Sequence, residues 1–365
     1  MQDFLAAIYI NFPWGILAGV ITLILVTILR PLARKTGLLD TPGGRKTHAG
    51  NIPLIGGICI YVTISGTFLM TEGLESEIKW LLGSASLLIL LGVADDLFDI
   101  RAIYKLAGQV AASCLMIWGT DLHIDILAYL PSGTPVGAGI FGYALTVIAV
   151  TGVINAFNMI DGIDGLAGLM AIISTSLIGL IIIILGREYI HDTELGIFRG
   201  AVGGYLLVNL ALVSRRKIFL GDAGSMLIGF VVGWALIYYS QLPPENAMPP
   251  SMALWIIALP VADTLVIMTR RIVRGRSPFS PDRKHLHHIF MRLGFSPLQT
   301  LAVICLMAIA LSIFGFMMYL LFGDIGSIAA FGLMTFGYYF FIRRVWRVSA
   351  FIRRRLIQPG GRGKI

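Results

Sequence analysis

The stretch "LLGSASLLILLGVADDLFDI" (residues 81–100) is apolar for most of its length and then ends on three carboxylates, Asp95, Asp96 and Asp99. Charged side chains close to lipid are costly, and where they occur they usually have a function. The pattern predicts a membrane-spanning helix whose last turn lies at the polar edge of the bilayer.

The composition of the whole chain agrees with this interpretation. The 365 residues are 57% hydrophobic and 13% charged, and the mean hydropathy is +0.84. Soluble domains carry about 25% charged residues, and about 20 apolar residues cross a bilayer. We therefore expect an all-α, polytopic membrane protein with about eleven transmembrane helices, at 12–33, 53–71, 79–94, 103–120, 138–157, 166–186, 195–213, 225–241, 251–269, 298–321 and 326–342. Residues 1–342 would form the integral membrane domain and 343–365 a basic cytoplasmic tail.

The distribution of basic residues predicts the orientation. Alternate connections hold nearly all of the 28 Lys and Arg residues, whereas the other connections hold only Lys79, Arg187 and Arg199. Cytoplasmic loops collect Lys and Arg, so the N-terminus is expected to be periplasmic and the C-terminus cytoplasmic. This asymmetry also explains the net charge of +8, and no nucleic-acid partner is expected.

Four polar motifs then fall on the cytoplasmic side. They are "DDLFD" (95–99), "NAFNMIDGIDG" (155–165), "FLGDAGS" (219–225) and "SPFSPDRKHLHH" (277–288). Independent segments that meet on one face are what an active site needs.

The aspartates of the first motif need a cationic partner. On a continuing helix Asp99 would share a face with both Asp95 and Asp96. Like charges so placed repel, so a divalent metal or a Lys or Arg from another segment would have to bring them together. A solvated acidic helix end is the alternative.

The second motif offers oxygen ligands. Asn155, Asn158 and Asp161 recur every third residue, Asp164 adds another carboxylate, and Gly162 and Gly165 let a ligand approach the backbone. Amides among carboxylates suit a hard cation. Helix capping by Asn and Asp would explain only some of these residues.

The last two motifs suit phosphate. Asp222 stands near the start of a span, where it could cap the helix or hold a metal that bridges to a phosphate. In the histidine segment, Pro278 and Pro281 predict a structured turn instead of a helix. Its cations and imidazoles favour binding of phosphates over zinc. An acidic centre with a basic rim points to Mg²⁺-dependent chemistry on a diphosphate, with a lipid phosphate as the second substrate.

Together, "ADDLFD", "NAFNMIDGIDGLAG", "FLGDAGS" and "SPFSPDRKHLHHIFMRLGF" resemble the polyprenyl-phosphate N-acetylhexosamine-1-phosphate transferases. The resemblance extends from "RKTHAGNIPLIGG" to the basic tail. It implies transfer of GlcNAc-1-phosphate from UDP-GlcNAc to undecaprenyl phosphate with release of UMP, as the first membrane step of O-antigen or surface polysaccharide synthesis. The implied location is the bacterial inner membrane, the implied cofactor is Mg²⁺ or Mn²⁺, and a homodimer is compatible with the family.

The resemblance also implies roles for single residues. Asp95 and Asp96 match the pair near the attacking lipid phosphate, Asp222 matches the main Mg²⁺ ligand, and Asn158 is a further candidate metal ligand. Asp161 and Asp164 match catalytic and uridine-contacting carboxylates, and Phe219 matches a residue that packs on uracil. His285 is a candidate catalytic residue. The remaining candidate substrate-binding residues are Asn155, Arg271, Arg283, His287, His288, Lys46 and His48.

Three alternatives stay open. The chain could use another UDP-N-acetylhexosamine, it could act through a covalent aspartyl-phosphate, or it could be an anion transporter. A transporter would place ionisable residues near the bilayer midplane. Only Asp263, inside "ALPVADTLVIM" (258–268), lies there, and after Pro260 it could mark a broken ninth span or a polar patch inside the bundle.

Overall fold

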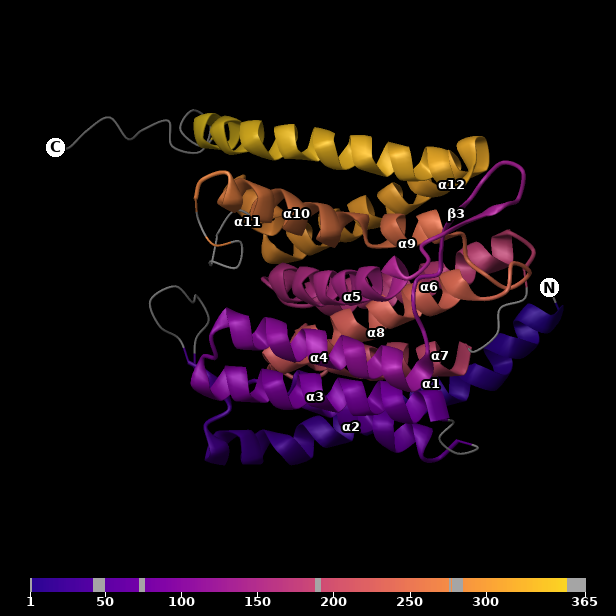
Figure 1. Ribbon diagram of the computed structural model, residues 1–365. Helices are drawn as coiled ribbons and strands as arrows, with labels where there is room; N and C mark the ends of the chain where they lie inside the picture. Colours follow the sequence, from indigo (N-terminus) through magenta and orange to yellow (C-terminus); the bar gives the residue numbers. More distant parts are fainter. Residues whose placement is uncertain are drawn as a thin grey trace.

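The computed structural model describes residues 2–41, 50–71, 76–187, 192–275, 277 and 285–352. Within these ranges the chain is mainly helical (Figure 1). The helices are α1 (Gln2–Thr36), α2 (Gly56–Phe68), α3 (Ser76–Phe98), α4 (Ala102–Thr120), α5 (Phe141–Ile160), α6 (Leu166–Ile184), α7 (Asp192–Asn209), α8 (Gly221–Gln241), α9 (Pro250–Ile256), α10 (Ala258–Ile272), α11 (Leu286–Arg292) and α12 (Pro297–Ile352).

Two antiparallel ribbons interrupt the helices. They pair β1 (Leu39–Asp40) with β2 (Ile52–Pro53) and β3 (Ile126–Tyr129) with β4 (Pro135–Gly137). The expectation of an all-α chain is met by the bulk of the fold and misses these ribbons. Strands of two to four residues are too short for an alternating pattern to reveal them.

The described residues contain six helices that are long and apolar enough to cross a membrane, or seven if the bent pair α9–α10 is one span. The six are Pro13–Thr36, α3, α5, α6, α8 and Pro297–Val345. The helix α2 is apolar but has only 13 residues. These spans make the chain a multi-pass membrane protein.

The apolar helices of the C-terminal part are interrupted at two places. The α9 and α10 axes differ by 74° across Ile257, so the ninth apolar run is a broken helix, as its Pro260 and Asp263 suggested. Pro260 falls in the first turn of α10, where its missing N–H group costs nothing. In α12, Gly323 has a φ of +66° and a ψ of −170°, so the two apolar runs 298–321 and 326–342 are separate arms. Both arms contact the ring of Trp255 in α9, through Phe314 and Phe331.

The helix α8 lies in the centre of the bundle. In its most apolar window 94% of the residues are buried inside the protein. Glycines let its neighbours approach its first turn: a Cβ on Gly57 of α2 would lie 2.3 Å from the Gly224 nitrogen, and one on Gly92 of α3 would lie 2.2 Å from the Ala223 Cα. Backbone contact of this kind fixes the start of α8 against α2 and α3.

The helix α1 packs against α7 on one face and is exposed on another. A Cβ on Gly200 would lie 1.9 Å from the Gly15 carbonyl oxygen, so the two backbones touch, as small residues allow between membrane helices. On its other side, Ile24 and Ile28 are 51% and 59% exposed. The exposed face is expected to contact lipid.

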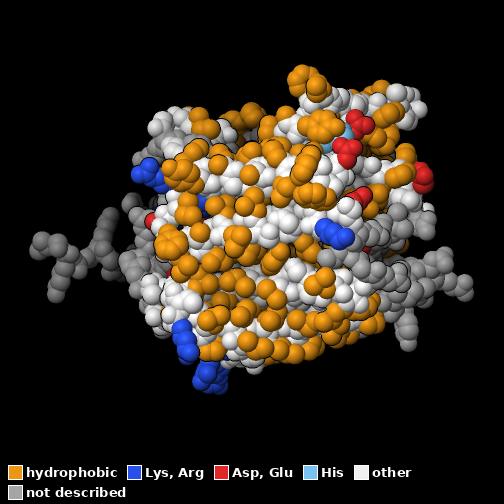
Figure 2. All heavy atoms as spheres, turned by 60° about the horizontal axis from the view of Figure 1, so that its bottom comes forward, with side chains coloured by type: hydrophobic (Ala, Val, Ile, Leu, Met, Phe, Trp, Pro, Cys, Tyr) orange, Lys and Arg blue, Asp and Glu red, His pale blue; other side chains and the backbone are white. Residues whose placement is uncertain are grey.

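The ends of the helices gather the polar residues. In Figure 1 the end of α10 and the helix α11 lie at the left, at the opposite end of the bundle from the start of α1. Figure 2 shows the lower face of the bundle, where a broad band of apolar side chains covers the middle and most of the visible Lys and Arg side chains lie toward the left. The helix α12 continues to Ile352, past the expected domain boundary at residue 342.

Candidate active site

Asp95 lies in the last turn of α3. The Asp95 Oδ1 atom accepts a hydrogen bond of 2.8 Å from the Ile100 backbone N–H, and the Asp95 carbonyl accepts one of 2.9 Å from the Asp99 N–H. Asp99 has a φ of +51°, which ends the helix. Asp99 therefore does not share a helical face with the other two aspartates and belongs to the helix terminus.

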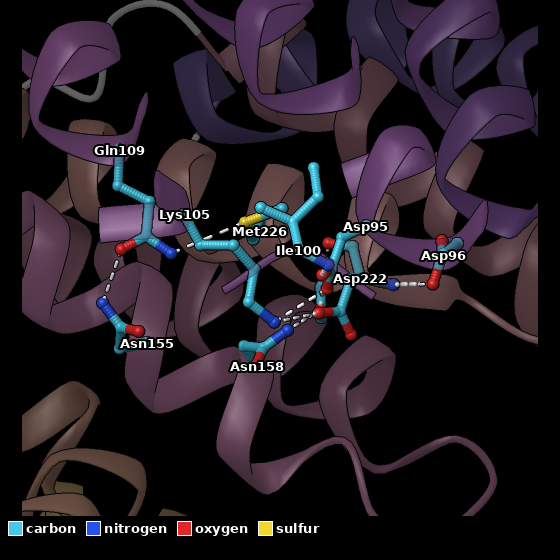
Figure 3. A network of polar contacts seen from close by, with 10 residues as sticks. Asp95, Asp96, Ile100, Lys105, Gln109, Asn155, Asn158, Asp222 and Met226 are labelled. Carbon is cyan, nitrogen blue, oxygen red and sulfur yellow. Dashed lines mark hydrogen bonds and ion pairs between the residues drawn. The ribbon is translucent and has the colours of Figure 1, made fainter. Parts of the chain in front are cut away.

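Lys105 joins α3 and α8. It lies in the first turn of α4, and its Nζ atom is 2.7 Å from Asp95 Oδ2 and 3.0 Å from Asp222 Oδ2 (Figure 3). Two carboxylates from distant segments thus share one ammonium group. The sequence predicted a cation for this cluster but assigned no residue, because Lys105 was counted only as a cytoplasmic loop charge. The short connection between α3 and α4, which turns the chain back on itself, is the signal that could have identified it.

Asp96 holds the start of α8. Its Oδ1 atom accepts a hydrogen bond of 3.1 Å from the Asp222 backbone N–H. Gly221 has a φ of +72°, and a Cβ there would lie 2.5 Å from Asp96 Oδ2. The capping role considered for Asp222 is wrong, because α8 is capped by Asp96 of α3. The Asp222 side chain is turned to Lys105 instead.

The two asparagines of α5 have different surroundings. The Asn158 amide donates to Ser225 Oγ at 2.9 Å and interacts with the Asp222 carboxylate. Asn155, one turn earlier, donates to Gln109 Oε1 at 2.6 Å and to the Thr151 carbonyl. Asn158 therefore lies beside Asp222, whereas Asn155 is tied to α4 through Gln109, a residue that no sequence motif singled out.

Asp161 and Asp164 lie in the turn between α5 and α6. Asp161 is half-buried, and burial followed by the negative charges of Asp222, Asp164 and Asp96 raises its pKa to about 7. Asp164 accepts a hydrogen bond of 2.5 Å from Lys217 Nζ, a second cation that the motifs did not reveal. Gly165 has a φ of +80° and supplies the turn. Because the charges of Asp222 and Asp96 act on Asp161, the ends of α3 and α5 and the start of α8 lie close together.

The histidines at the start of α11 contact α10 and the turn between α5 and α6. The His285 Nδ1 atom is 2.9 Å from Asp263 Oδ2, and the Tyr338 hydroxyl donates to Asp263 Oδ1 at 2.9 Å. This assigns a role to Asp263: it lies inside the bundle and holds His285 in place. The ring of His287 lies over Gly162, where a Cβ would be 2.3 Å from His287 Nε2.

The prediction of a turn through residue 288 is wrong for its last part. The helix α11 begins at Leu286, so His287 and His288 are helical. The prolines that suggested a turn, Pro278 and Pro281, precede this helix and lie outside the described residues. His287 is buried, and burial together with His288 and His285 lowers its pKa to about 3. It is therefore neutral at any physiological pH.

The other candidates are spread around this centre. Arg271 is buried in the last turn of α10. Phe219 is half-buried, and its backbone pairs with the Pro53 carbonyl and the Gly56 N–H at 2.9 Å each. Lys46, His48 and Arg283 lie outside the described residues.

The donor set around Asp222 fits a magnesium ion. Among the described residues no group of three His, Cys, Asp or Glu side chains could hold a metal. Mg²⁺ does not need one, since it is usually bound through one or two carboxylates together with water and substrate phosphates. The Asp222 carboxylate, the Asn158 amide beside it and the nearby Asp161 carboxyl group supply such a partial coordination shell.

Comparisons with known proteins agree with this geometry. Residues 78–240 match the model of glycosyl transferase family 4. The chain is 39% identical over 340 residues to the undecaprenyl-phosphate alpha-N-acetylglucosaminyl 1-phosphate transferase of Escherichia coli strain K12, covering 91% of each chain. The chain belongs to glycosyl transferase family 4.

Further relatives carry the same name. The protein of Salmonella typhi is 38% identical over 336 residues, and that of Pasteurella multocida strain Pm70 is 37% identical over 341 residues, with 89% of this chain and 92% of the relative covered. The matched family segment runs from α3 to α8 and so includes Asp95, Lys105, Asn158 and Asp222. The chain is a transferase of the glycosyl-1-phosphate class, and the resemblance seen in its motifs is confirmed.

Proposed function

We propose that this chain transfers GlcNAc-1-phosphate from UDP-GlcNAc to undecaprenyl phosphate and releases UMP. The acceptor and the sugar are those in the names of its relatives. The observation that carries the proposal is the lysine-bridged pair Asp95 and Asp222 at the ends of α3 and α8. Beside it, His287 of α11 lies against Gly162 in the turn that follows Asp161. A lipid phosphate can reach these helix ends while its tail stays in the bilayer.

The reaction exchanges one phosphorus–oxygen bond for another. An oxygen of undecaprenyl phosphate attacks the sugar-bearing phosphorus of UDP-GlcNAc, the bond to the UMP oxygen breaks, and undecaprenyl-diphospho-GlcNAc forms. A phosphate monoester has a second pKa of about 6 and is largely dianionic near neutral pH. Little proton abstraction is needed, so Asp95 and Asp96 act mainly by positioning the nucleophile and the groups that contact it.

The charges of the two substrates are balanced by this chain's cations. Lys105 lies between the carboxylates and can turn toward an incoming phosphate. His285, His287, His288, Arg271, Arg283, Lys46 and His48 form the proposed diphosphate-binding rim. Hydrogen bonds from such groups stabilise the charge that develops in the transition state. Bound Mg²⁺, held by Asp222 and Asn158 with Asp161 close by, would supply further neutralisation of phosphate oxygens.

The nucleoside would lie on the opposite side of the centre. Phe219 offers a ring for the uracil, Asp164 a carboxylate for the uridine, and Asn155 a more distant contact through Gln109. A neutral His287 donates or accepts a hydrogen bond without adding charge.

The proposed topology has eleven spans. They are α1, α3, α5, α6, α8, the bent pair α9–α10, the two arms of α12, and the helices α2, α4 and α7, which do not meet the length and apolarity criteria. The N-terminus would be periplasmic, the site cytoplasmic and the membrane the bacterial inner membrane, which is where a soluble UDP-sugar is accessible. Synthesis of O-antigen or another surface polysaccharide is the proposed use of the product.

One assay tests the function. Purified protein in detergent is given Mg²⁺, undecaprenyl phosphate and one of several UDP-sugars, and UMP release is measured with and without EDTA. We expect UMP only with UDP-GlcNAc and lipid together, and none with EDTA. Release with another UDP-N-acetylhexosamine alone would assign a different donor. Activity that survives EDTA would overturn the metal assignment, and solute counterflow in proteoliposomes without UMP would indicate a transporter.

A further inference from the structure

A polar cavity lies beside the candidate active site. It has a volume of about 380 Å³ and is lined by residues 51–53 and by five cationic residues. These are Arg30, Arg34, Arg215, Arg216 and Lys217. No Asp or Glu is among the described residues that line it. The volume lies within the range of small-molecule sites, about 300–1,000 Å³.

The guanidinium of Arg30 is fixed in this cavity with one donor unused. Its Nη2 atom donates to the Arg216 carbonyl at 2.5 Å, which joins the end of α1 to the segment before α8. Its Nε atom is buried and has no hydrogen-bond partner within the described part of the chain. A buried donor without an acceptor is unfavourable, so this atom is available to an acceptor from outside the described residues, such as a bound anion.

The five cationic residues of this cavity differ from the basic residues that are common in cytoplasmic loops of membrane proteins. Such charges are usually dispersed in solvent, whereas these side chains come from segments far apart in sequence and converge on one cavity. Within the described ranges, Arg34, Arg215 and Arg216 form no ion pair with a carboxylate, and only Lys217 has one, with Asp164. Cations gathered in this way repel one another unless an anion lies between them.

The position of the cavity favours an anion that belongs to the membrane. Arg30 and Arg34 lie one turn apart at the end of the membrane-spanning helix α1, whose exposed apolar side chains include Ile24 and Ile28. Basic pockets at the ends of membrane helices bind the headgroups of anionic lipids, so a lipid beside α1 could place its headgroup in the cavity. We propose that the cavity binds the phosphate group of an anionic ligand, with the headgroup of an anionic phospholipid as its source. The cavity adjoins the proposed donor site, since Lys217 also pairs with Asp164, but its ligand takes no part in the proposed reaction.

The test compares two neighbouring cations. The variant R34Q combined with R216Q removes two charges from the cavity but keeps Arg30, whose hydrogen bond holds the Arg216 backbone. K35Q is the matched control, because Lys35 is exposed in the same helical turn and does not line the cavity. The single variant R34Q serves if the double variant folds poorly.

The readout is the thermal unfolding midpoint of the full chain in neutral detergent at low salt. The probes are short-chain phosphatidylglycerol, short-chain phosphatidylcholine and inorganic phosphate. We expect phosphatidylglycerol to raise the midpoint of the wild type and of K35Q, with an apparent Kd that rises about fivefold for each cavity cation removed. Phosphatidylcholine should have little effect.

The outcomes separate the two sources of phosphate. A response to phosphatidylglycerol alone identifies a lipid headgroup, and an equal response to inorganic phosphate supports the site with a soluble ligand. An effect of phosphatidylglycerol that is the same in R34Q/R216Q as in the wild type would overturn the proposal. So would a loss of the effect in K35Q as large as in the cavity variant, because the attraction would then be general surface charge.

Discussion

The carboxylate of Asp96 at the end of α3 accepts the backbone N–H of Asp222 at the start of α8, with an oxygen–nitrogen distance of 3.1 Å. One aspartate thereby determines where the other stands. Because the N-terminus of a helix carries a partial positive charge, a carboxylate at this position is favourable.

Replacement of Asp96 by Ala should separate capping from chemistry. We expect D96A to lose about 1–2 kcal/mol of stability, the usual cost of losing a helix cap. D96N keeps an oxygen acceptor and should lose less. The measurement is thermal unfolding in detergent, with UMP release recorded beside it. Equal destabilisation by both variants would show that the hydrogen bond to Asp222 contributes little.

Gly221 offers an independent test of the same contact. A methyl group at this position would meet Asp96 Oδ2, and its φ of +72° is unfavourable for Ala. G221A should therefore lower stability and UMP release. Ala at Gly203, which has open space around it, is the matched control and should have little effect.

Loss of Lys105 should change how the site binds cations. In K105Q the Asp95 and Asp222 carboxylates lose their shared ammonium group, so their mutual repulsion favours a divalent cation. We expect Mn²⁺ to bind roughly tenfold more tightly in the absence of substrates, while UMP release falls. Titration of Mn²⁺ by electron paramagnetic resonance measures the affinity. The arginine variant K105R keeps the charge and should retain the weaker wild-type affinity; tighter binding there would contradict the explanation.

The raised pKa of Asp161 gives the stability a pH dependence. Between the unfolded value near 4 and the folded value of about 7, the folded protein keeps a proton that the unfolded chain releases. The contribution of Asp161 to the stability of the metal-free protein should therefore fall as the pH rises through this window, by at most about 1.4 kcal/mol per pH unit. D161N removes this contribution and should be more stable than the wild type at pH 8 in EDTA.

Thermal unfolding between pH 5 and 8 measures this difference. Added Mg²⁺ should stabilise the wild type at pH 8 more than D161N, because the ion relieves the repulsion that D161N lacks. An unchanged slope in D161N would mean that another group causes the pH dependence.

Because Asp263 accepts hydrogen bonds from both His285 and Tyr338, we expect different results from removing Tyr338's hydroxyl group and from removing the Asp263 carboxylate. Y338F removes one neutral donor and should cost about 1 kcal/mol with little change in KM for the donor. D263A leaves both His285 and Tyr338 without their acceptor and should raise this KM, because His285 is no longer held. Steady-state kinetics with varied UDP-GlcNAc measure both. A KM for D263A like that of Y338F would remove His285 from the donor site.

The parts of this site that could be predicted are those with a local signal. Apolar runs located the helices, Pro260 and Asp263 marked the broken span, and the basic loops placed the polar motifs at one end. The pairings that order the site are between segments far apart in sequence. No pattern around Lys105 indicates Asp222, and none around Tyr338 indicates Asp263, because these contacts exist only after the helices pack. Capping of α8 by a residue of α3 was missed for the same reason: sequence rules assume that a cap is local.

The central position of α8 also has a consequence for biosynthesis. Asp96 precedes Asp222 by 126 residues, so α3 leaves the ribosome well before the helix that it caps. Until then, the carboxylates of α3 have Lys105, the Ile100 backbone N–H and water as partners. In the folded protein α8 contacts other helices on nearly all sides. It must therefore pack between helices that were synthesised before it. Insertion into the membrane and assembly of the active centre are thus separate events, and the second waits for α8.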